Sequence, residues 1–135
     1  MYGGILMADL NEKINEFTNT ENTTSQFDSS DINNNKIMAI LAYISWLVLI
    51  PLLFAKDSKF ARFHVNQGLV LAISEILVGL ILGVLDGIPL IGWIFSIAGS
   101  LLGIVCFIFS ILGIINALNG QAKELPIIGK FRILQ

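Results

Sequence analysis

The chain has 135 residues, of which 55% are hydrophobic and only 13% are charged, with a formal net charge of −2. Ordinary globular chains carry about 25% charged residues, so this composition argues against a soluble globular protein. The basic residues form no patch of the size that nucleic-acid binding requires, which excludes nucleic acid as a partner.

The first 35 residues are polar and acidic, rich in Asn, Thr, Ser and Glu. They contain too few apolar residues to offset the entropy of ordering the segment, so we predict a disordered region at 1–35 and a membrane domain at 36–135. The tandem glycines Gly3 and Gly4 can be encoded by a purine-rich sequence that resembles a bacterial ribosome-binding site. Met7 is therefore the expected native start, which the intact mass of natively expressed protein tests.

Three apolar stretches are each long enough to cross a bilayer as a helix: residues 37–55, 68–85 and 93–118. The first has 19 residues, which rise about 28 Å in a helix and match a hydrocarbon core of about 30 Å. None has the polar face of a soluble core helix. The predicted fold is an all-α membrane protein with three transmembrane helices, the first bent by Pro51.

Turn residues and a glycine mark the ends of the second and third predicted helices. Asp86, Gly87 and Pro89 follow the second stretch, so the second and third stretches are predicted to form an antiparallel hairpin. Gly120 is the predicted stop of the last helix. The tail beyond it alternates apolar residues with Lys130 and Arg132. Its roughly ten residues are too few to cross a bilayer. We expect the tail to lie on the membrane surface with its basic groups toward anionic lipid.

Basic residues near the predicted helix ends indicate the orientation, because cytoplasmic loops carry an excess of lysine and arginine. The loop at 56–67 and the tail after Leu118 are basic, whereas the loop at 86–92 has no basic residue. With three spans, the loop and the tail are predicted to face the cytoplasm of a bacterial cell, and the N-terminus to lie outside. Lys36, at the outer edge of the first stretch, is a contrary signal.

Small residues recur at four-residue spacing in the second and third stretches, which permits close helix approach in lipid. We predict a seam between these two helices, with a second copy of the chain as a further candidate partner. The alternative is that glycine is simply frequent in membrane helices. The predicted packing residues are Gly79, Gly83, Gly87, Ser96, Gly99 and Gly103.

Glu75 is the single charged residue of the second stretch. A carboxylate facing lipid is costly, so it is expected to face the bundle interior or a wet cavity. Three roles remain open: a structural residue hydrogen-bonded to Tyr43, Ser45 or a serine of the third stretch, a residue lining a polar path, or a proton site. His64 lies eleven residues earlier, about 16 Å along a helix, too far for a direct bond.

The stretch before Glu75 is amphipathic. Arg62, His64, Asn66 and Gln67 are predicted to form a polar collar at the level of the lipid headgroups. We expect neither an enzyme nor a cofactor or metal site, since the sequence has no nucleophile–base pair, no phosphate-binding loop and no ligand cluster. The lone Cys106 is expected to be a small buried hydrophobe.

Several motifs resemble a large family of small bacterial membrane proteins of undefined function. They are KIMAILAYISWLVLIPLLF at 36–54, ARFHVNQGL at 61–69 and a closing PIIGK. The family is similar to the membrane-channel component of the chloroplast inner-envelope protein import machinery, and magnetosome membrane proteins belong to the same grouping. The resemblance implies a bundle of three or four membrane helices and no reaction. The matching positions are Arg62, Phe63, His64, Asn66, Gln67, Gly68, Pro126, Gly129 and Lys130.

Two function classes are predicted. The first is a scaffold, accessory or assembly factor whose partners are the lipid bilayer, a second copy or another membrane protein. The second is an oligomeric transport or protein-translocation component with a polar path around Glu75. Substitution of Glu75 by Gln distinguishes them, because only the transport class loses function when folding is intact.

Overall fold

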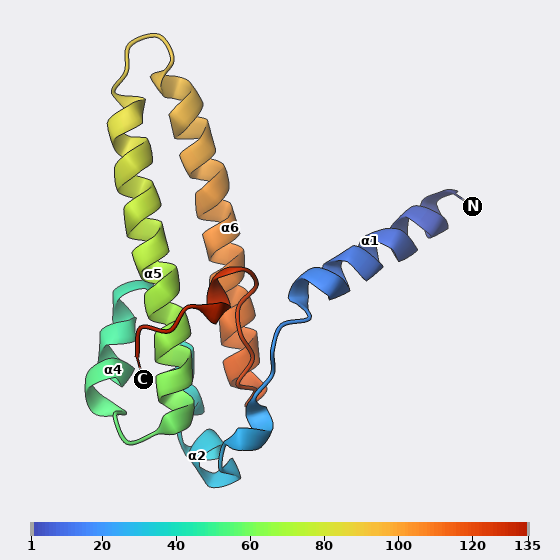
Figure 1. The fold of residues 1–135 in the computed structure, drawn as a ribbon, viewed down its shortest axis with the longest axis vertical. Coiled ribbons are helices and arrows are strands. Elements are labelled where there is room, and N and C mark those ends of the chain that lie inside the picture. The colour runs from blue at the N-terminus through green and yellow to red at the C-terminus, as the bar shows by residue number, and fades with distance from the viewer. Residues whose placement is uncertain (1, 135) are drawn as a thin grey trace.

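Two long antiparallel helices dominate the computed structural model, which describes residues 2–134. These are α5 (Lys59–Asp86) and α6 (Gly92–Leu118), which run side by side in Figure 1. Their 28 and 27 residues are each about 40 Å long, more than the hydrocarbon core of a bilayer. Both are long and apolar enough to cross a membrane, as predicted for residues 68–85 and 93–118. The predicted all-helical class is confirmed over the described residues, which contain no strand.

The upper halves of α5 and α6 expose large apolar side chains almost all round. Only 17% of the most apolar window of each helix is buried within the protein. A helix of a soluble protein would bury an apolar stripe against a core and show polar residues elsewhere. This exposure therefore fits two helices that are surrounded by lipid.

A tight turn joins α5 to α6 and confirms the predicted hairpin. Gly87 caps α5, and Gly92 begins α6 so close to the preceding helix that a Cβ there would lie 1.9 Å from the carbonyl oxygen of Asp86. The hydroxyl of Ser96 donates a hydrogen bond to the carboxylate of Asp86. This pair holds the beginning of α6 against the end of α5.

The first predicted span, residues 37–55, is not one helix, and three transmembrane helices are not confirmed. It comprises α3 (Lys36–Leu41), the 3₁₀ turn η2 (Ser45–Val48) and α4 (Leu49–Phe54). The chain reverses before η2, where Ser45 has a φ of 48°, in the left-handed region. Pro51 is the third residue of α4, where a missing N–H leaves no bond unmade. The proline therefore accompanies a helix start instead of the predicted bend.

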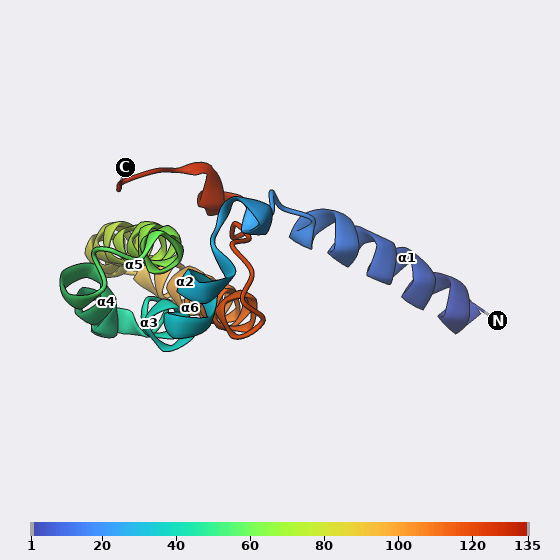
Figure 2. The same cartoon turned by 90° about the horizontal axis from the view of Figure 1, so that it is seen from below.

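Residues 36–54, which we call the short hairpin, enter and leave at the same end of the α5–α6 pair. Asp31, just before it, accepts hydrogen bonds from the Ser58 hydroxyl (2.6 Å) and the Phe60 N–H (2.9 Å) at the start of α5. Figures 1 and 2 show α4 beside the lower half of α5. The side chain of Asp31 thus ties the entrance of the short hairpin to its exit.

Residues 20–36, 55–67 and 119–134 consequently gather at one end of the molecule, which we call the basic end. It includes every lysine and arginine of the chain except Lys13. The sequence analysis instead placed the N-terminal region and the tail on opposite sides of the membrane. That arrangement required residues 37–55 to cross as one helix, and the short hairpin does not form one.

In the N-terminal region, for which disorder is predicted, the structure describes three short or medium helices. They are α1 (Tyr2–Thr18), η1 (Thr24–Gln26) and α2 (Ser29–Asn34), and α1 projects away from the rest in Figure 1. Apolar residues of α1 recur at three- and four-residue spacing, a helical pattern that the overall polarity of the segment obscured. They are Met7, Leu10, Ile14 and Phe17.

Residues 20–24 lie along the tail and cross the predicted domain boundary at residue 35. The Thr23 N–H donates to the carbonyl of Ala122, and the Glu124 N–H donates to the carbonyl of Glu21, both at 3.0 Å. Phe27 packs edge-on against Phe60, with ring centroids 6.2 Å apart. The segment from residue 20 onward is thus fixed by hydrogen bonds and by the aromatic contacts of Phe27.

The tail is predicted to lie on the membrane surface, but the structure packs part of it against the protein. Gly120 ends α6 with a φ of 67°, as expected of a helix stop, and a Cβ there would come within 2.9 Å of Ile32. The chain then folds back along α5, where Leu125 is buried in the core beside Val65. The turn η3 (Ile128–Lys130) follows, and Phe131 is exposed. The apolar residues that suggested a tail on the membrane surface are divided between the core and the exterior.

Candidate functional site

His64 lies at the centre of the basic end and is fully buried. Its Nδ1 accepts a hydrogen bond from the Tyr43 hydroxyl at 2.6 Å, and its Nε2 donates to the Gln121 carbonyl at 2.9 Å. A carbonyl can only accept, so Nε2 carries the proton, and a neutral imidazole satisfies both bonds. The ring links the short hairpin, α5 and the tail. The ring therefore faces other segments of the protein and not the exterior that a polar collar requires, because neither ring nitrogen reaches the surface.

Asn66 and Gln67 fix the tail to α5 through their side-chain amides. The Nδ2 of Asn66 donates to the Phe131 carbonyl at 2.9 Å, and its Oδ1 accepts from the Ile133 and Leu134 N–H groups at 2.6 and 3.0 Å. Gln67 lies beside it and is also buried. Such amides offer a donor and an acceptor together, which lets one side chain bind a segment that has no regular partner.

The amide of Gln67 makes the second of these attachments. It donates to the Gly129 carbonyl and accepts from the Leu125 N–H, each at 2.9 Å. Gly129 packs so closely that a Cβ there would lie 2.7 Å from the Cβ of Glu124 and 2.8 Å from the Oε1 of Gln67. The glycine of PIIGK is therefore required by space, and the predicted residues Gln67 and Gly129 meet directly.

Glu124 is a buried carboxylate in the tail. Its side chain is 4% exposed, and its Oε1 pairs with the guanidinium of Arg132 at 2.8 Å. Arg132 also donates to the Gly129 carbonyl and lies over the ring of Phe63 at 5.6 Å from its centroid. The pairing meets the requirement that a buried charge have a partner. Arg132 thus closes the tail on itself and against α5.

The remaining family-like positions differ in their surroundings. Pro126 is buried in the tail, and Arg62 is half-buried where α5 begins. Lys130 is exposed at the end of η3. Gly68 is the point of closest approach between α5 and the short hairpin, since a Cβ there would lie 1.9 Å from the Ala42 carbonyl oxygen. Most of the predicted positions therefore assemble one structural unit at the basic end.

Glu75 lies away from that unit, at the level of the tip of the short hairpin. Among the described residues it makes no hydrogen bond or ion pair, and the Tyr43 hydroxyl, one of its predicted partners, is bonded to His64. It borders three cavities of about 520, 250 and 20 Å³. Ser45 and Ser110 line the smallest together with Glu75, and that space is comparable with a single water. Glu75 thus lies beside cavities, and of its three open roles the structural one has no hydrogen bond to support it among the described residues.

The small residues form a looser seam than predicted. A Cβ at Gly99 would make ordinary contact with Leu82 at 3.6 Å, so this position does face the neighbouring helix. Cβ atoms at Gly79, Gly83 and Gly103 would meet nothing within 4 Å. The closest helix contacts occur elsewhere: a Cβ at Gly113 would lie 2.2 Å from the ring of Tyr43.

Sequence reasoning missed Gln121, Glu124 and Asp31. Gln121 takes part through its backbone carbonyl, which no side-chain pattern reveals. Glu124 was masked by the basic residues around it, and Asp31 by the polar segment assigned to disorder. Ser58 carried a usable signal, because its hydroxyl also caps α5 by accepting from the Ala61 N–H at 3.0 Å.

Comparison with known proteins places these features in a family. Residues 34–132 match the magnetosome magnetite crystal formation protein family. The magnetosome protein MmsF of Paramagnetospirillum magneticum is 38% identical over 93 residues, which cover 68% of this chain and 79% of MmsF. The magnetosome protein MamF of the same organism is 33% identical over 96 residues, covering 70% of this chain and 79% of MamF.

The chain is also similar to a protein from an archaeon. A UPF0132 membrane protein of Methanocaldococcus jannaschii is 34% identical over 92 residues, which cover 67% of this chain and 61% of that protein. No solved structure matches. These matches show the magnetosome part of the predicted resemblance, and they do not show the chloroplast import part. The matched region begins just before the short hairpin and ends at Arg132, so it includes the whole unit around His64.

Proposed function

The chain belongs to the magnetosome magnetite crystal formation protein family, a family that includes membrane proteins, and from this premise we propose that it is a non-catalytic accessory or scaffold protein of a bacterial cytoplasmic membrane. One observation supports this most directly. The polar side chains of the ARFHVNQG stretch bind the chain's own tail and short hairpin. Among the described residues, no buried side-chain nitrogen or oxygen lacks a hydrogen-bond partner. A general base needs a free nitrogen or oxygen within reach of a substrate, and His64 has both ring nitrogens engaged.

The fixed basic end is the surface that would carry such a role. Its exposed lysines, among them Lys56, Lys59 and Lys130, are held on segments that His64, Asn66 and Gln67 lock together. A preordered surface loses less entropy on binding than a mobile one. In this proposal the basic end faces the cytoplasm and holds a second copy or another membrane protein.

The names of the relatives limit what can be proposed about the biological process of this chain. Two relatives are named as magnetosome proteins and the third only as a membrane protein. The proposal therefore takes from them only a place in a membrane. It takes no mineral chemistry, and the described residues contain no cluster of metal-ligating side chains.

Photo-crosslinking in native membranes tests the accessory role. A photoreactive residue at Lys130, exposed at the basic end, is compared with one at Leu90, which is 93% exposed in the turn at the opposite end. A recurrent protein crosslinked from position 130 and absent from position 90 is the expected result. Identical patterns from both positions, or crosslinks to lipid alone, would contradict it.

Transport or protein translocation is the second candidate, and one observation favours it. Glu75 makes no hydrogen bond or ion pair among the described residues, and it borders cavities between helices that are apolar at that level. A carboxylate at such a depth commonly marks a polar or ion path. Two long helices are too few to enclose a pore, so this function requires an oligomer, and the resemblance to the chloroplast import component belongs with it.

Flux into liposomes separates the two candidates. The protein and its Glu75→Gln variant are reconstituted and compared for the passage of protons and small ions. An accessory protein gives no flux above that of empty liposomes in either form. Flux that Glu75→Gln abolishes, with helix content unchanged, would establish transport instead.

A further inference from the structure

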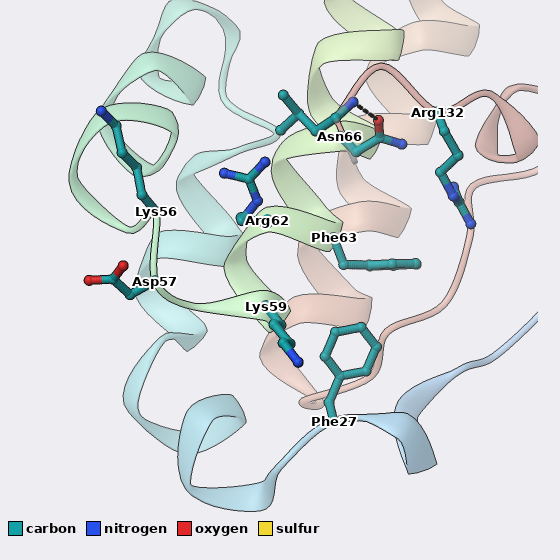
Figure 3. A pocket seen from close by; sticks show the side chains of 9 residues that line it. Phe27, Lys56, Asp57, Lys59, Arg62, Phe63, Asn66 and Arg132 are labelled. Atoms are coloured by element: carbon teal, nitrogen blue, oxygen red, sulfur yellow. Dashed lines mark hydrogen bonds between the residues drawn. The ribbon is translucent and has the colours of Figure 1, made fainter.

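A cavity of about 520 Å³ opens at the basic end, where the loop before α5, the first turns of α5 and the tail meet. We call it the basic cavity. Figure 3 shows Lys56 and Asp57 on one side of it, Phe63 and Arg132 on the other, and Arg62 between them. Its volume falls within the range of about 300–1,000 Å³ that is usual for small-molecule sites.

The charges of the basic cavity favour an anion. Four cationic side chains line it against one carboxylate, Asp57, and the cationic ones are Lys56, Lys59, Arg62 and Arg132. Arg132 is shared with Glu124, so the two exposed lysines carry the part of the argument that rests on charge. Guanidinium and ammonium groups bind phosphate oxygens through charge-assisted hydrogen bonds.

The walls of the basic cavity are apolar. Phe27, Phe63 and Leu134 line it together with the cations, and the amide of Asn66 lies at its edge. Phe27 and Phe63 meet edge-on with ring centroids 5.9 Å apart, which gives the cavity a rigid aromatic side. A fully hydrated inorganic anion gains nothing from such a wall, whereas the glycerol and upper acyl carbons of a lipid do.

The position of the basic cavity along α5 indicates that the anion belongs to a lipid. The apolar part of α5 runs from Gly68 to Asp86, about 28 Å, which is close to the thickness of the hydrocarbon core. Arg62 and Phe63 lie one to two turns before Gly68. They therefore lie where the helix leaves the hydrocarbon, at the level of the lipid phosphates.

We propose that the basic cavity is a binding site for an anionic phospholipid, which places its phosphate between Lys59, Arg62 and Arg132 and its glycerol carbons against Phe27 and Phe63. Lys56 adds attraction from the rim. The site goes beyond the proposed binding of protein partners and does not depend on it. It also gives the family-like Arg62 and Phe63 a ligand.

Lipid titration of the purified full-length protein in detergent tests the site, with bound lipid counted by native mass spectrometry. Dioleoylphosphatidylglycerol is compared with dioleoylphosphatidylcholine, and Lys56→Gln/Lys59→Gln with a matched double variant, Lys123→Gln/Lys130→Gln, which removes the same charge from the basic end outside the cavity. A basic side chain near an anionic surface contributes about 1 kcal/mol, or about fivefold in affinity. We expect the cavity variant to lose about 25-fold in phosphatidylglycerol affinity and the matched variant less than threefold.

Three outcomes would overturn the proposal. Equal losses in the two double variants would mean diffuse attraction to the whole basic end. Equal affinity for the two lipids would remove the role of charge. Displacement of the lipid by millimolar inorganic phosphate would indicate a site for a free anion. Circular dichroism and elution volume report folding, and the single variants Lys56→Gln and Lys59→Gln, each expected to lose about fivefold, replace the double variant if it unfolds.

Discussion

The Tyr43–His64 hydrogen bond is a buried polar contact between the short hairpin and α5. Tyr43→Phe would leave Nδ1 of His64 without a donor, and His64→Leu would leave both the Tyr43 hydroxyl and the Gln121 carbonyl unpaired. Removing one partner of a buried hydrogen bond costs about 1–3 kcal/mol. We expect each variant to lower the free energy of unfolding by that order, with His64→Leu the more severe, as measured by reversible unfolding in mixed micelles.

The double variant distinguishes a shared bond from two independent packing effects. If the Tyr43 hydroxyl serves only His64, then Tyr43→Phe adds no further loss once His64→Leu is present, because it removes the hydroxyl that His64→Leu leaves unpaired. The coupling free energy from the double-mutant cycle is then about 1 kcal/mol or more. Additive losses would show that the two side chains contribute separately and that the bond is unimportant.

His64, Asn66 and Gln67 could be singled out from the sequence, but their surroundings could not. The polar character of the stretch and its family resemblance identified them. Their partners, however, are the carbonyls of Gln121, Phe131 and Gly129, which lie 57 to 65 residues further along the chain. Backbone groups carry no sequence signal, so exposure at the headgroup level was the natural expectation for an amphipathic entry to a membrane helix.

At the scale of elements, the approach of α5 to the short hairpin depends on Gly68. A Cβ at this position would lie 1.9 Å from the Ala42 carbonyl oxygen and 2.8 Å from its carbon, and backbone atoms cannot swing aside. We expect Gly68→Ala to separate the two elements and to lower the free energy of unfolding by about 1–3 kcal/mol. Thermal unfolding of the detergent-solubilised protein, followed by circular dichroism, measures the change.

Gly79→Ala is the matched control for this substitution. It makes the same chemical change in the same helix, but nothing lies within 4 Å of the added Cβ. Alanine favours a helix over glycine by about 0.5–1 kcal/mol, so Gly79→Ala should be neutral or stabilising. If both variants destabilise equally, close approach at residue 68 is not the cause, and a second copy packed on Gly79 would explain the result.

The elements that composition defines were predicted, and those that local geometry defines were not. The α5–α6 hairpin followed from two long apolar runs joined by turn residues. Residues 37–55 are equally apolar, but the chain reverses at Ser45, and the proline six residues later fits both a bent helix and a helix start. Hydropathy measures whether a segment avoids water. It does not distinguish a segment that crosses the membrane from one that enters it and turns back.

At the scale of the whole molecule, the short hairpin changes the topology. With α5 and α6 as the two crossing helices, residues before α3, the loop before α5 and the tail all lie on one side. For such a two-span chain, the positive-inside rule predicts that both termini lie in the cytoplasm. Lys36, which contradicted three spans, lies on the same side as the other basic residues of the basic end and agrees with this arrangement.

Cysteine accessibility distinguishes the two topologies. In a Cys106→Ala background, single cysteines replace Ser29, Asp57 and Leu90, all of them exposed, and intact cells and inverted vesicles are treated with a membrane-impermeant maleimide. The structure and the positive-inside rule predict that positions 29 and 57 react only in inverted vesicles, and position 90 only in intact cells. A three-span chain with its N-terminus outside makes positions 29 and 90 react together in intact cells. Because residue 29 alone changes sides, its labelling decides whether the short hairpin turns back within the membrane.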